Sequence, residues 1–218
     1  MKPADDPTVD YRKLVRDGYD QCSRAYTEAR RREAGDELAP LLARLAKGSR
    51  VLDLGCGSGV PIAAALAREH RVTGIDASPE QIRRARENVT SATFRLADAM
   101  SVEFPPESFD AVVAFYAIFH LPREEHEELF RRVEGWLAPG GYFTATVSHY
   151  REAAYTEDGF FGARMYWSNW SREDYVGMLA RLGFELLEAR AIGHGYDGSE
   201  PRRPESHPLL FARKPQRS

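Results

Sequence analysis

From about residue 50 onward, short apolar runs alternate with longer amphipathic stretches. This alternation is typical of strands joined by crossover helices in a mostly parallel sheet. The predicted strands are residues 50–54, 72–75, 93–96, 111–115, 142–147, 184–192 and 208–213. The pattern therefore predicts an α/β fold with a doubly wound, mostly parallel, seven-stranded sheet and helices on both faces.

Helix-start signals lie between several of these strands. Residues 61–69 are alanine-rich and begin with a proline, which is tolerated in the first turn of a helix. Ser78 followed by Pro79 is a cap and first-turn pair that opens a second helix. Pro122 precedes a third predicted helix over residues 123–137.

Two segments fall outside the alternation. Helical patterns over residues 11–32 and 36–47 precede the first strand, so we expect them to cover the sheet as a lid rather than to connect strands. Residues 148–170 are rich in aromatic side chains without a clear period, and we interpret them as an insertion. We expect one domain, divided into an N-terminal helical lid (1–47), a cofactor-binding core (48–148), an aromatic substrate-side insertion (149–170) and a C-terminal helix with strands (171–218).

The first predicted strand runs directly into a glycine-rich turn, Val51-Leu52-Asp53-Leu54-Gly55-Cys56-Gly57-Ser58-Gly59. Such a turn lets a ligand approach bare backbone at the start of a helix. A dinucleotide fingerprint would need a glycine at the sixth position, where counting from Gly55 gives Val60. Asp76 ends the second predicted strand, where a carboxylate can accept both hydroxyls of a ribose.

The stretch Val51 to Gly59 resembles the first motif of class I S-adenosylmethionine-dependent methyltransferases. The resemblance continues in Leu96-Ala97-Asp98-Ala99, in Phe109-Asp110-Ala111-Val112-Val113 and in Leu137-Ala138-Pro139-Gly140-Gly141, and it covers roughly residues 48–148. It implies the Rossmann-like fold of that family, with an antiparallel last strand, and S-adenosylmethionine as cofactor with S-adenosylhomocysteine as product.

The resemblance also implies a set of cofactor-binding residues. Gly55 and Gly57 would line the methionine part, Asp76 the ribose, and the segment around Asp98 the adenine. The complete predicted set is Tyr19, Tyr26, Asp53, Gly55, Cys56, Gly57, Asp76, Ala77, Asp98, Ala99 and Phe115. We expect the Asp53 carboxylate to accept backbone N–H groups of the glycine loop, and we assign Cys56 no chemistry of its own.

A sulfonium methyl group is already activated, so the protein mainly has to align the reactants and exclude water. A general base is useful where the acceptor must lose a proton, and histidine suits that role near neutral pH. His120 follows the fourth strand and is the predicted catalytic residue, although a packing role is an open alternative. His149, Tyr166 and Trp167 are predicted substrate contacts, and His194 is a weaker candidate.

Composition narrows the classes of partner. The chain has 218 residues and a formal charge of −3, with basic and acidic residues interspersed, so no surface for nucleic acid is implied. No run of apolar residues is long enough for a membrane span. The two cysteines lack metal-site spacing, and we expect no disulfide, no metal site and a cytoplasmic location. The expected partner is a small-molecule methyl acceptor, and the aromatic insertion could instead form a homodimer contact.

Two alternatives from other classes stay open at this point. A nicotinamide-dependent oxidoreductase would share the acid at position 76 but not the spacing of the glycines. A non-catalytic S-adenosylmethionine-binding protein would share every binding motif, because motifs for binding do not prove turnover. Nucleic-acid base methyltransferases carry an Asp/Asn-Pro-Pro-aromatic motif after the fourth strand, where this chain has Ala114-Phe115-Tyr116-Ala117.

Overall fold

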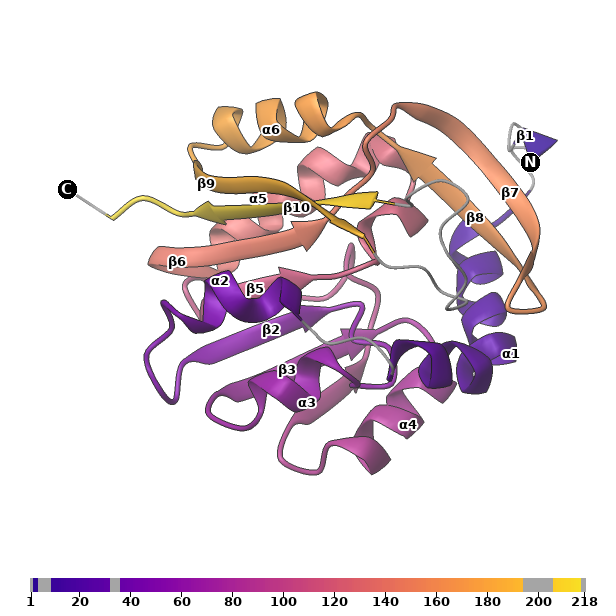
Figure 1. Cartoon of the computed structure of the whole chain (residues 1–218), viewed down its shortest axis with the longest axis horizontal. Coiled ribbons are helices and arrows are strands. Elements are labelled where there is room, and N and C mark those ends of the chain that lie inside the picture. The colour runs from indigo at the N-terminus through magenta and orange to yellow at the C-terminus, as the bar shows by residue number, and fades with distance from the viewer. Residues whose placement is uncertain (1, 4–8, 32–35, 194–205, 217–218) are drawn as a thin grey trace.

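The computed structural model describes residues 2–3, 9–31, 36–193 and 206–216. A seven-stranded sheet with the order β4-β3-β2-β5-β6-β10-β9 forms its centre (Figure 1). These strands are β2 (Arg50–Leu54), β3 (Arg71–Asp76), β4 (Thr93–Leu96), β5 (Phe109–Ala114), β6 (Leu137–Thr146), β9 (Glu185–Gly193) and β10 (Ser206–Arg213). Strands β2 to β6 pair in parallel, and β10 runs antiparallel to both β6 and β9. The predicted sheet and its antiparallel last strand are confirmed.

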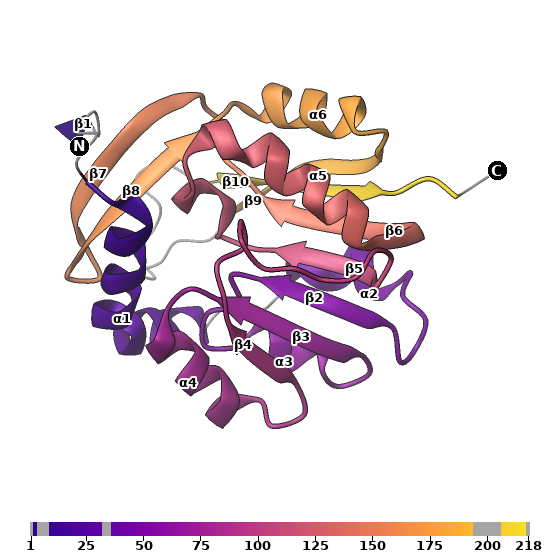
Figure 2. The same cartoon turned by 180° about the vertical axis from the view of Figure 1, so that it is seen from behind.

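Helices cover both faces of this sheet (Figures 1 and 2). These helices are α2 (Ala39–Leu42), α3 (Ile62–Leu66), α4 (Pro79–Asn88), α5 (His126–Trp136) and α6 (Arg172–Arg181), while α1 (Tyr11–Arg30) lies beyond the carboxyl ends of the strands. Buried side chains of α5 and α6 share one hydrophobic core with the sheet, and those of α2, α3 and α4 share the other.

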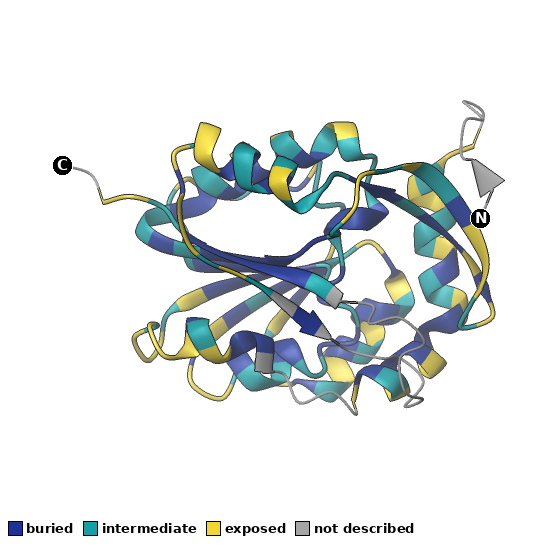
Figure 3. Cartoon of the chain, turned by 45° about the horizontal axis from the view of Figure 1, so that its top comes forward, coloured by how far each residue is buried: buried dark blue, intermediate teal, exposed yellow. Residues whose placement is uncertain are grey.

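Alternation of side chains along the central strands explains the two cores. In β5, Ala111 and Val113 belong to the core beneath α2, α3 and α4, whereas Val112 and Ala114 belong to the core beneath α5 and α6. All four are fully buried, because a parallel strand with helices on both faces has no solvent side. Figure 3 shows this distribution, with buried central strands and exposed positions on the outer helix surfaces.

Several predicted helices are shorter than expected. The segment 36–47 contains a 3-10 turn, Asp36–Leu38, and then only the four residues of α2. The segment 61–69 contains the five residues of α3, and the segment 123–137 begins with a 3-10 turn before α5 starts at His126. Sequence patterns locate helix ends poorly, because frayed and 3-10 turns share the composition of the helix.

The aromatic insertion forms a β-hairpin rather than an irregular segment. Strands β7 (Glu152–Phe160) and β8 (Ala163–Asn169) pair antiparallel, and the two-residue strand β1 (Lys2–Pro3) adds to β7. The hairpin packs along α1 beyond the carboxyl ends of the parallel strands (Figures 1 and 2). Helix α1 and the hairpin together cover this end of the sheet, whereas α2, from the second segment of the predicted lid, packs on a face of the sheet in the core shared with α3 and α4.

Helix α1 begins at the N-cap Asp10, whose side chain accepts a hydrogen bond from the Lys13 amide at 3.0 Å. Gly18 allows the close approach of β8, since a Cβ atom there would lie 2.8 Å from the Arg164 carbonyl oxygen. At 20 residues α1 is the longest helix described, and none of the described helices is long and apolar enough to cross a bilayer.

Candidate functional site

A cavity that is open to solvent lies between helix α1 and the carboxyl ends of β2, β3, β4 and β5. Ligands of open parallel sheets bind at this edge. Nine of the predicted cofactor-binding residues line the cavity, namely Tyr19, Tyr26, Gly55, Gly57, Asp76, Ala77, Asp98, Ala99 and Phe115. The predicted catalytic residue His120 lines it too. The structure therefore brings together side chains from five separate parts of the chain.

The glycine loop forms the floor of the cavity at the end of β2. Its amide at Cys56 donates to the Ile75 carbonyl at 2.9 Å, which fixes the loop to β3. Gly55 has a φ angle of +68°, and a Cβ atom at this position would lie 2.5 Å from the Ala117 side chain. Only glycine fits this position without displacing the segment after β5.

The Asp76 carboxylate organises the loop. It accepts from the Gly57 amide at 2.9 Å and from the Ser78 amide at 2.8 Å. Burial raises its pKa to about 6, against the effect of these backbone hydrogen bonds. Each carboxylate oxygen has a second lone pair, so Asp76 can hold the loop and accept further hydrogen bonds from a ligand in the cavity.

Asp53 does not have the scaffold role that we expected from the sequence. Its Oδ2 atom is buried and has no hydrogen-bond partner among the described residues, and Asp76 takes the Gly57 amide instead. Asp53 instead lines a second, smaller cavity together with Arg30 and Cys56. Burial raises the pKa of Asp53 to about 7 and that of the Cys56 thiol well above its ordinary range.

The two cavities adjoin, since Tyr26, Gly55, Gly57 and Phe115 line both. The smaller one presents a carboxylate and the buried guanidinium of Arg30, which pairs with Glu37 and lies 4.3 Å from the Tyr116 ring centroid. A guanidinium has five N–H donors. The smaller cavity can therefore recognise a ligand group that carries both an ammonium and a carboxylate.

Polar contacts of helix α1 close the roof of the larger cavity. Arg12 forms an ion pair with Asp98 at 3.1 Å and a second one with Glu125, in the 3-10 turn before α5. Asp20 accepts from the Ser78 hydroxyl at 2.5 Å and from the Glu80 amide at 3.1 Å, which joins α1 to the start of α4. These contacts reach both the β4 and the α4 sides of the cavity.

His120 lies at the end of a 3-10 turn, Ile118–His120, where the apolar part of the cavity begins. Its Nε2 atom lies 2.7 Å from the Tyr19 hydroxyl and its Nδ1 atom 2.9 Å from the Tyr166 carbonyl oxygen. Burial lowers the pKa of His120 to about 4. The imidazole is therefore neutral at physiological pH.

The structure does not bring the predicted substrate contacts His149, Tyr166 and Trp167 onto the cavity wall. His149 follows β6, and the charges of Arg172 and Glu173 in the first turn of α6 act on its imidazole. Tyr166 reaches the site through its carbonyl, while its ring stacks on Tyr11. Trp167 packs behind His120, with ring centroids 4.4 Å apart. His194 lies outside the described residues.

Several lining residues were not predicted, among them three long polar side chains that belong to no sequence motif. Arg12 and Arg30 come from α1, and Gln81 comes from α4. The side-chain amide of Gln81 is buried, and neither its nitrogen nor its oxygen has a hydrogen-bond partner among the described residues. Arg30 was detectable in principle, because it continues the four-residue spacing of the buried residues Gly18, Cys22 and Tyr26.

Comparisons with known proteins agree with this geometry. A family model described as "Methyltransferase domain" matches residues 51–141. The 27-O-demethylrifamycin SV methyltransferase of Amycolatopsis mediterranei is 40% identical over 113 residues, which cover 49% of this chain and 40% of that protein. Methyltransferase GfsG of Streptomyces halstedii is 31% identical over 196 residues, which cover 83% of this chain and 67% of that protein.

Solved structures share the fold. The 1,6-didemethyltoxoflavin-N1-methyltransferase of Burkholderia thailandensis, crystallised with 1,6-didemethyltoxoflavin and S-adenosylhomocysteine, superposes with a TM-score of 0.73 at 20% identity. The match covers 98% of this chain and 94% of that one. The chain spans about two fifths and two thirds of the length of the two curated relatives named above.

Proposed function

Since the chain belongs to the class I S-adenosylmethionine-dependent methyltransferases, we propose that it transfers the methyl group of S-adenosylmethionine to a small, largely apolar molecule. The observation that carries the proposal is the mixed character of the larger cavity. Its lining combines the glycine loop, Asp76 and Asp98 at the strand ends with a set of apolar side chains from the segment after β5, where Tyr19 and His120 also lie. A polar cofactor and an apolar acceptor can meet within this cavity.

The residues present fit S-adenosylmethionine. The buried Oδ2 atom of Asp53, which has no hydrogen-bond partner among the described residues, can accept from the ammonium of the methionine part. Arg30 can bind its carboxylate. Asp76 would accept the ribose hydroxyls, and the segment Asp98-Ala99 would contact the adenine. Bound there, the cofactor supplies a methyl group on a positively charged sulfur, which needs no further activation.

Aromatic and aliphatic side chains form the wall left for the acceptor. Phe115, Ile118, Leu121 and Leu129 line this part of the cavity. Small-molecule sites are generally built this way, with few polar groups that fix orientation. The names of two similar proteins refer to small molecules, a demethylrifamycin and a didemethyltoxoflavin, which supports an acceptor of this size class.

The chain's own residues orient the acceptor and exclude water. Helix α1 and the β7–β8 hairpin cover the cavity, and Arg12 fastens α1 to Asp98 and Glu125. We propose that Nε2 of His120 accepts the proton. The neutral ring donates from Nδ1 to the Tyr166 carbonyl, which leaves Nε2 unprotonated. Closure of the site raises the strength of every polar contact inside it.

The test is turnover with S-adenosylmethionine and a panel of small apolar alcohols, phenols, amines and thiols, followed as S-adenosylhomocysteine formation. Enzyme-dependent product with a subset of the panel, lost in Asp76→Ala, supports the proposal. Binding of S-adenosylmethionine without turnover of any panel member favours the non-catalytic binding protein instead.

A further inference from the structure

A chain of hydrogen bonds crosses the acceptor side of the cavity and joins three elements. Tyr19 comes from the lid helix α1, His120 from the turn after β5, and the Tyr166 carbonyl from the hairpin strand β8. Tyr19 and His120 both line the cavity.

The direction of every hydrogen bond in this chain follows from its last member. A backbone carbonyl only accepts, so His120 carries its proton on Nδ1 and donates it to Tyr166. The neutral ring then has an unprotonated Nε2, which accepts the O–H of Tyr19. Since the Tyr19 proton points to His120, the Tyr19 oxygen keeps its acceptor character. The Tyr19 oxygen therefore presents acceptor lone pairs on the side away from His120.

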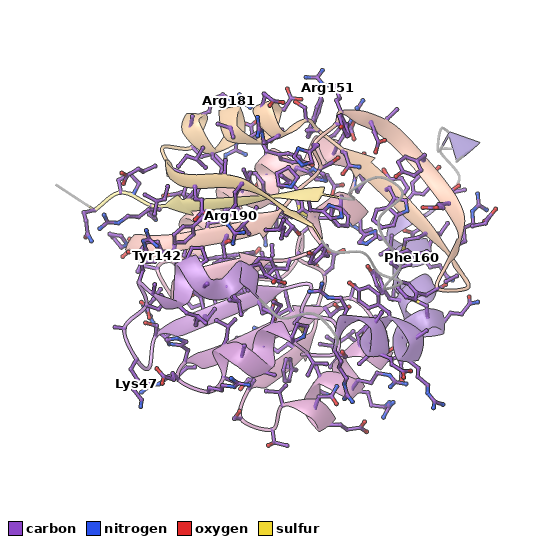
Figure 4. All side chains as sticks on the ribbon, in the orientation of Figure 1. Lys47, Tyr142, Arg151, Phe160, Arg181 and Arg190 are labelled. Carbon is purple, nitrogen blue, oxygen red and sulfur yellow. The ribbon has the colours of Figure 1, made fainter. Side chains whose placement is uncertain are left out.

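The surroundings hold His120 neutral and its ring fixed. Tyr19, Phe160 and Trp167 pack around it, with ring centroids at 5.2, 6.5 and 4.4 Å. Figure 4 shows Phe160 on the hairpin where it approaches α1. Burial among these rings favours the neutral imidazole and preserves the direction of the hydrogen bonds through the physiological pH range.

We propose that the methyl acceptor is a neutral hydroxyl group that donates its proton into this chain, and that Tyr19 is a catalytic residue which passes the proton to His120. The inference rests on the proposed methyltransferase function and deepens it. The acceptor oxygen bonds to the methyl carbon as the carbon–sulfur bond breaks, with its electron pair remaining on sulfur. The hydroxyl proton moves to the Tyr19 oxygen, and the Tyr19 proton moves to Nε2 of His120. One positive charge leaves sulfur and one appears on the imidazole, where the Tyr166 carbonyl stabilises it.

Other acceptor classes match the chain less well. A carboxylate would bring its lone pairs against the phenol lone pairs and has no proton to donate. An ammonium group has no lone pair for the methyl carbon and would first have to lose a proton inside an apolar wall. A neutral hydroxyl supplies both the donor that the chain requires and the lone pair that the reaction requires.

The experiment measures equilibrium binding of three matched probes, α-naphthol, naphthalene and α-naphthoate, to the complex with saturating S-adenosylhomocysteine. The variants are Tyr19→Phe, which breaks the chain, and His120→Gln, whose amide oxygen can accept from Tyr19 but cannot take up a proton. Tyr11→Phe is the matched control, because Tyr11 lies on the same helix, stacks on Tyr166 and is not among the cavity-lining residues.

The wild-type complex and Tyr11→Phe are expected to bind α-naphthol about tenfold more tightly than naphthalene, which corresponds to one buried hydrogen bond of about 1.4 kcal/mol. The preference is expected to disappear in Tyr19→Phe. In His120→Gln the preference stays, but methylation of α-naphthol falls by about 100-fold or more, since a proton-transfer residue contributes that much.

Three results overturn the inference: no preference for naphthol in the wild type, including failure to bind either probe; a preference that survives in Tyr19→Phe; or tighter binding of α-naphthoate. Absence of α-naphthol methylation by the wild type, or undiminished methylation by His120→Gln, overturns the proton relay. Failure of S-adenosylhomocysteine itself to bind is a different result, because it contradicts the proposed function.

Discussion

Replacing Asp53 by asparagine is expected to stabilise the free protein at alkaline pH and to weaken cofactor binding. Burial raises the pKa of this carboxyl from its ordinary 3.8 to about 7. At a pH above both pKa values the carboxyl is ionised in the folded and in the unfolded protein. The pKa difference then lowers the free energy of unfolding by about 4 kcal/mol, at about 1.4 kcal/mol per pKa unit. The side-chain amide that replaces the carboxyl would still be buried, and its unmet hydrogen bonds cost about 1–3 kcal/mol.

The expected net gain is therefore about 2 kcal/mol at pH 8, or roughly 4–8 °C in Tm for a domain of this size. The sign follows from the raised pKa of the folded state. The protonated carboxyl contributes its full stabilisation of the folded protein below the pKa of the unfolded state, near 4. This contribution is lost as the pH rises through the folded-state pKa of about 7. The Asp53→Asn variant should thus show its advantage at pH 8 and little at pH 4.5.

Thermal unfolding of the free protein at both pH values measures this effect, and calorimetric titration measures the cofactor. S-adenosylmethionine should bind about 10- to 100-fold more weakly to the variant, as expected for loss of a charge-assisted hydrogen bond. Asp110→Asn is the matched control of opposite sign, because Arg50 holds the pKa of Asp110 below its ordinary value. The reasoning is refuted if Asp53→Asn is equally stable to, or less stable than, the wild type at pH 8.

Three further outcomes are expected. Asp76→Ala should weaken S-adenosylmethionine binding by about 10- to 100-fold in calorimetry, because it also releases the Gly57 amide; unchanged affinity would remove the ribose assignment. Gly55→Ala should abolish cofactor binding, since its Cβ meets Ala117, whereas Gly48→Ala, with a similarly positive φ angle and no atom within 4 Å, should leave it intact. With S-adenosylmethionine saturating, so that titration of Asp53 and Asp76 in the free enzyme does not enter, kcat/KM for the acceptor should stay level from pH 8 down to about 5 and fall only as His120 is protonated near pH 4; an acid limb near 6.5 under these conditions would contradict the burial of this base.

The sheet could be predicted from the sequence because the central strands are continuous apolar runs separated by helix-start signals. Ser78 illustrates how local such signals are, since its side chain caps α4 by accepting from the Gln81 amide. The β7–β8 hairpin could not be predicted. Register shifts between Glu152 and Tyr155, and between Asp158 and Phe160, interrupt the two-residue alternation that marks a strand.

The cavity-lining residues on β2, β3 and β4 were predictable because their motifs end parallel strands, which meet at one edge. Arg12, Arg30 and Gln81 were not, because their positions depend on how helix surfaces dock against the sheet. His149 shows the converse, since it follows a sheet strand at the correct edge and yet lies toward α6. The order and direction of the strands determine at which edge of the sheet a segment lies, whereas the direction of each side chain depends on how it packs.

Calorimetric titration of the wild-type protein with S-adenosylmethionine, S-adenosylhomocysteine and NAD tests the central claim most directly. The arrangement of Asp53, Arg30 and Asp76 around the glycine loop predicts micromolar binding of the first two and no detectable binding of NAD. Binding of NAD, or of none of the three, would contradict the assignment of this cavity to S-adenosylmethionine.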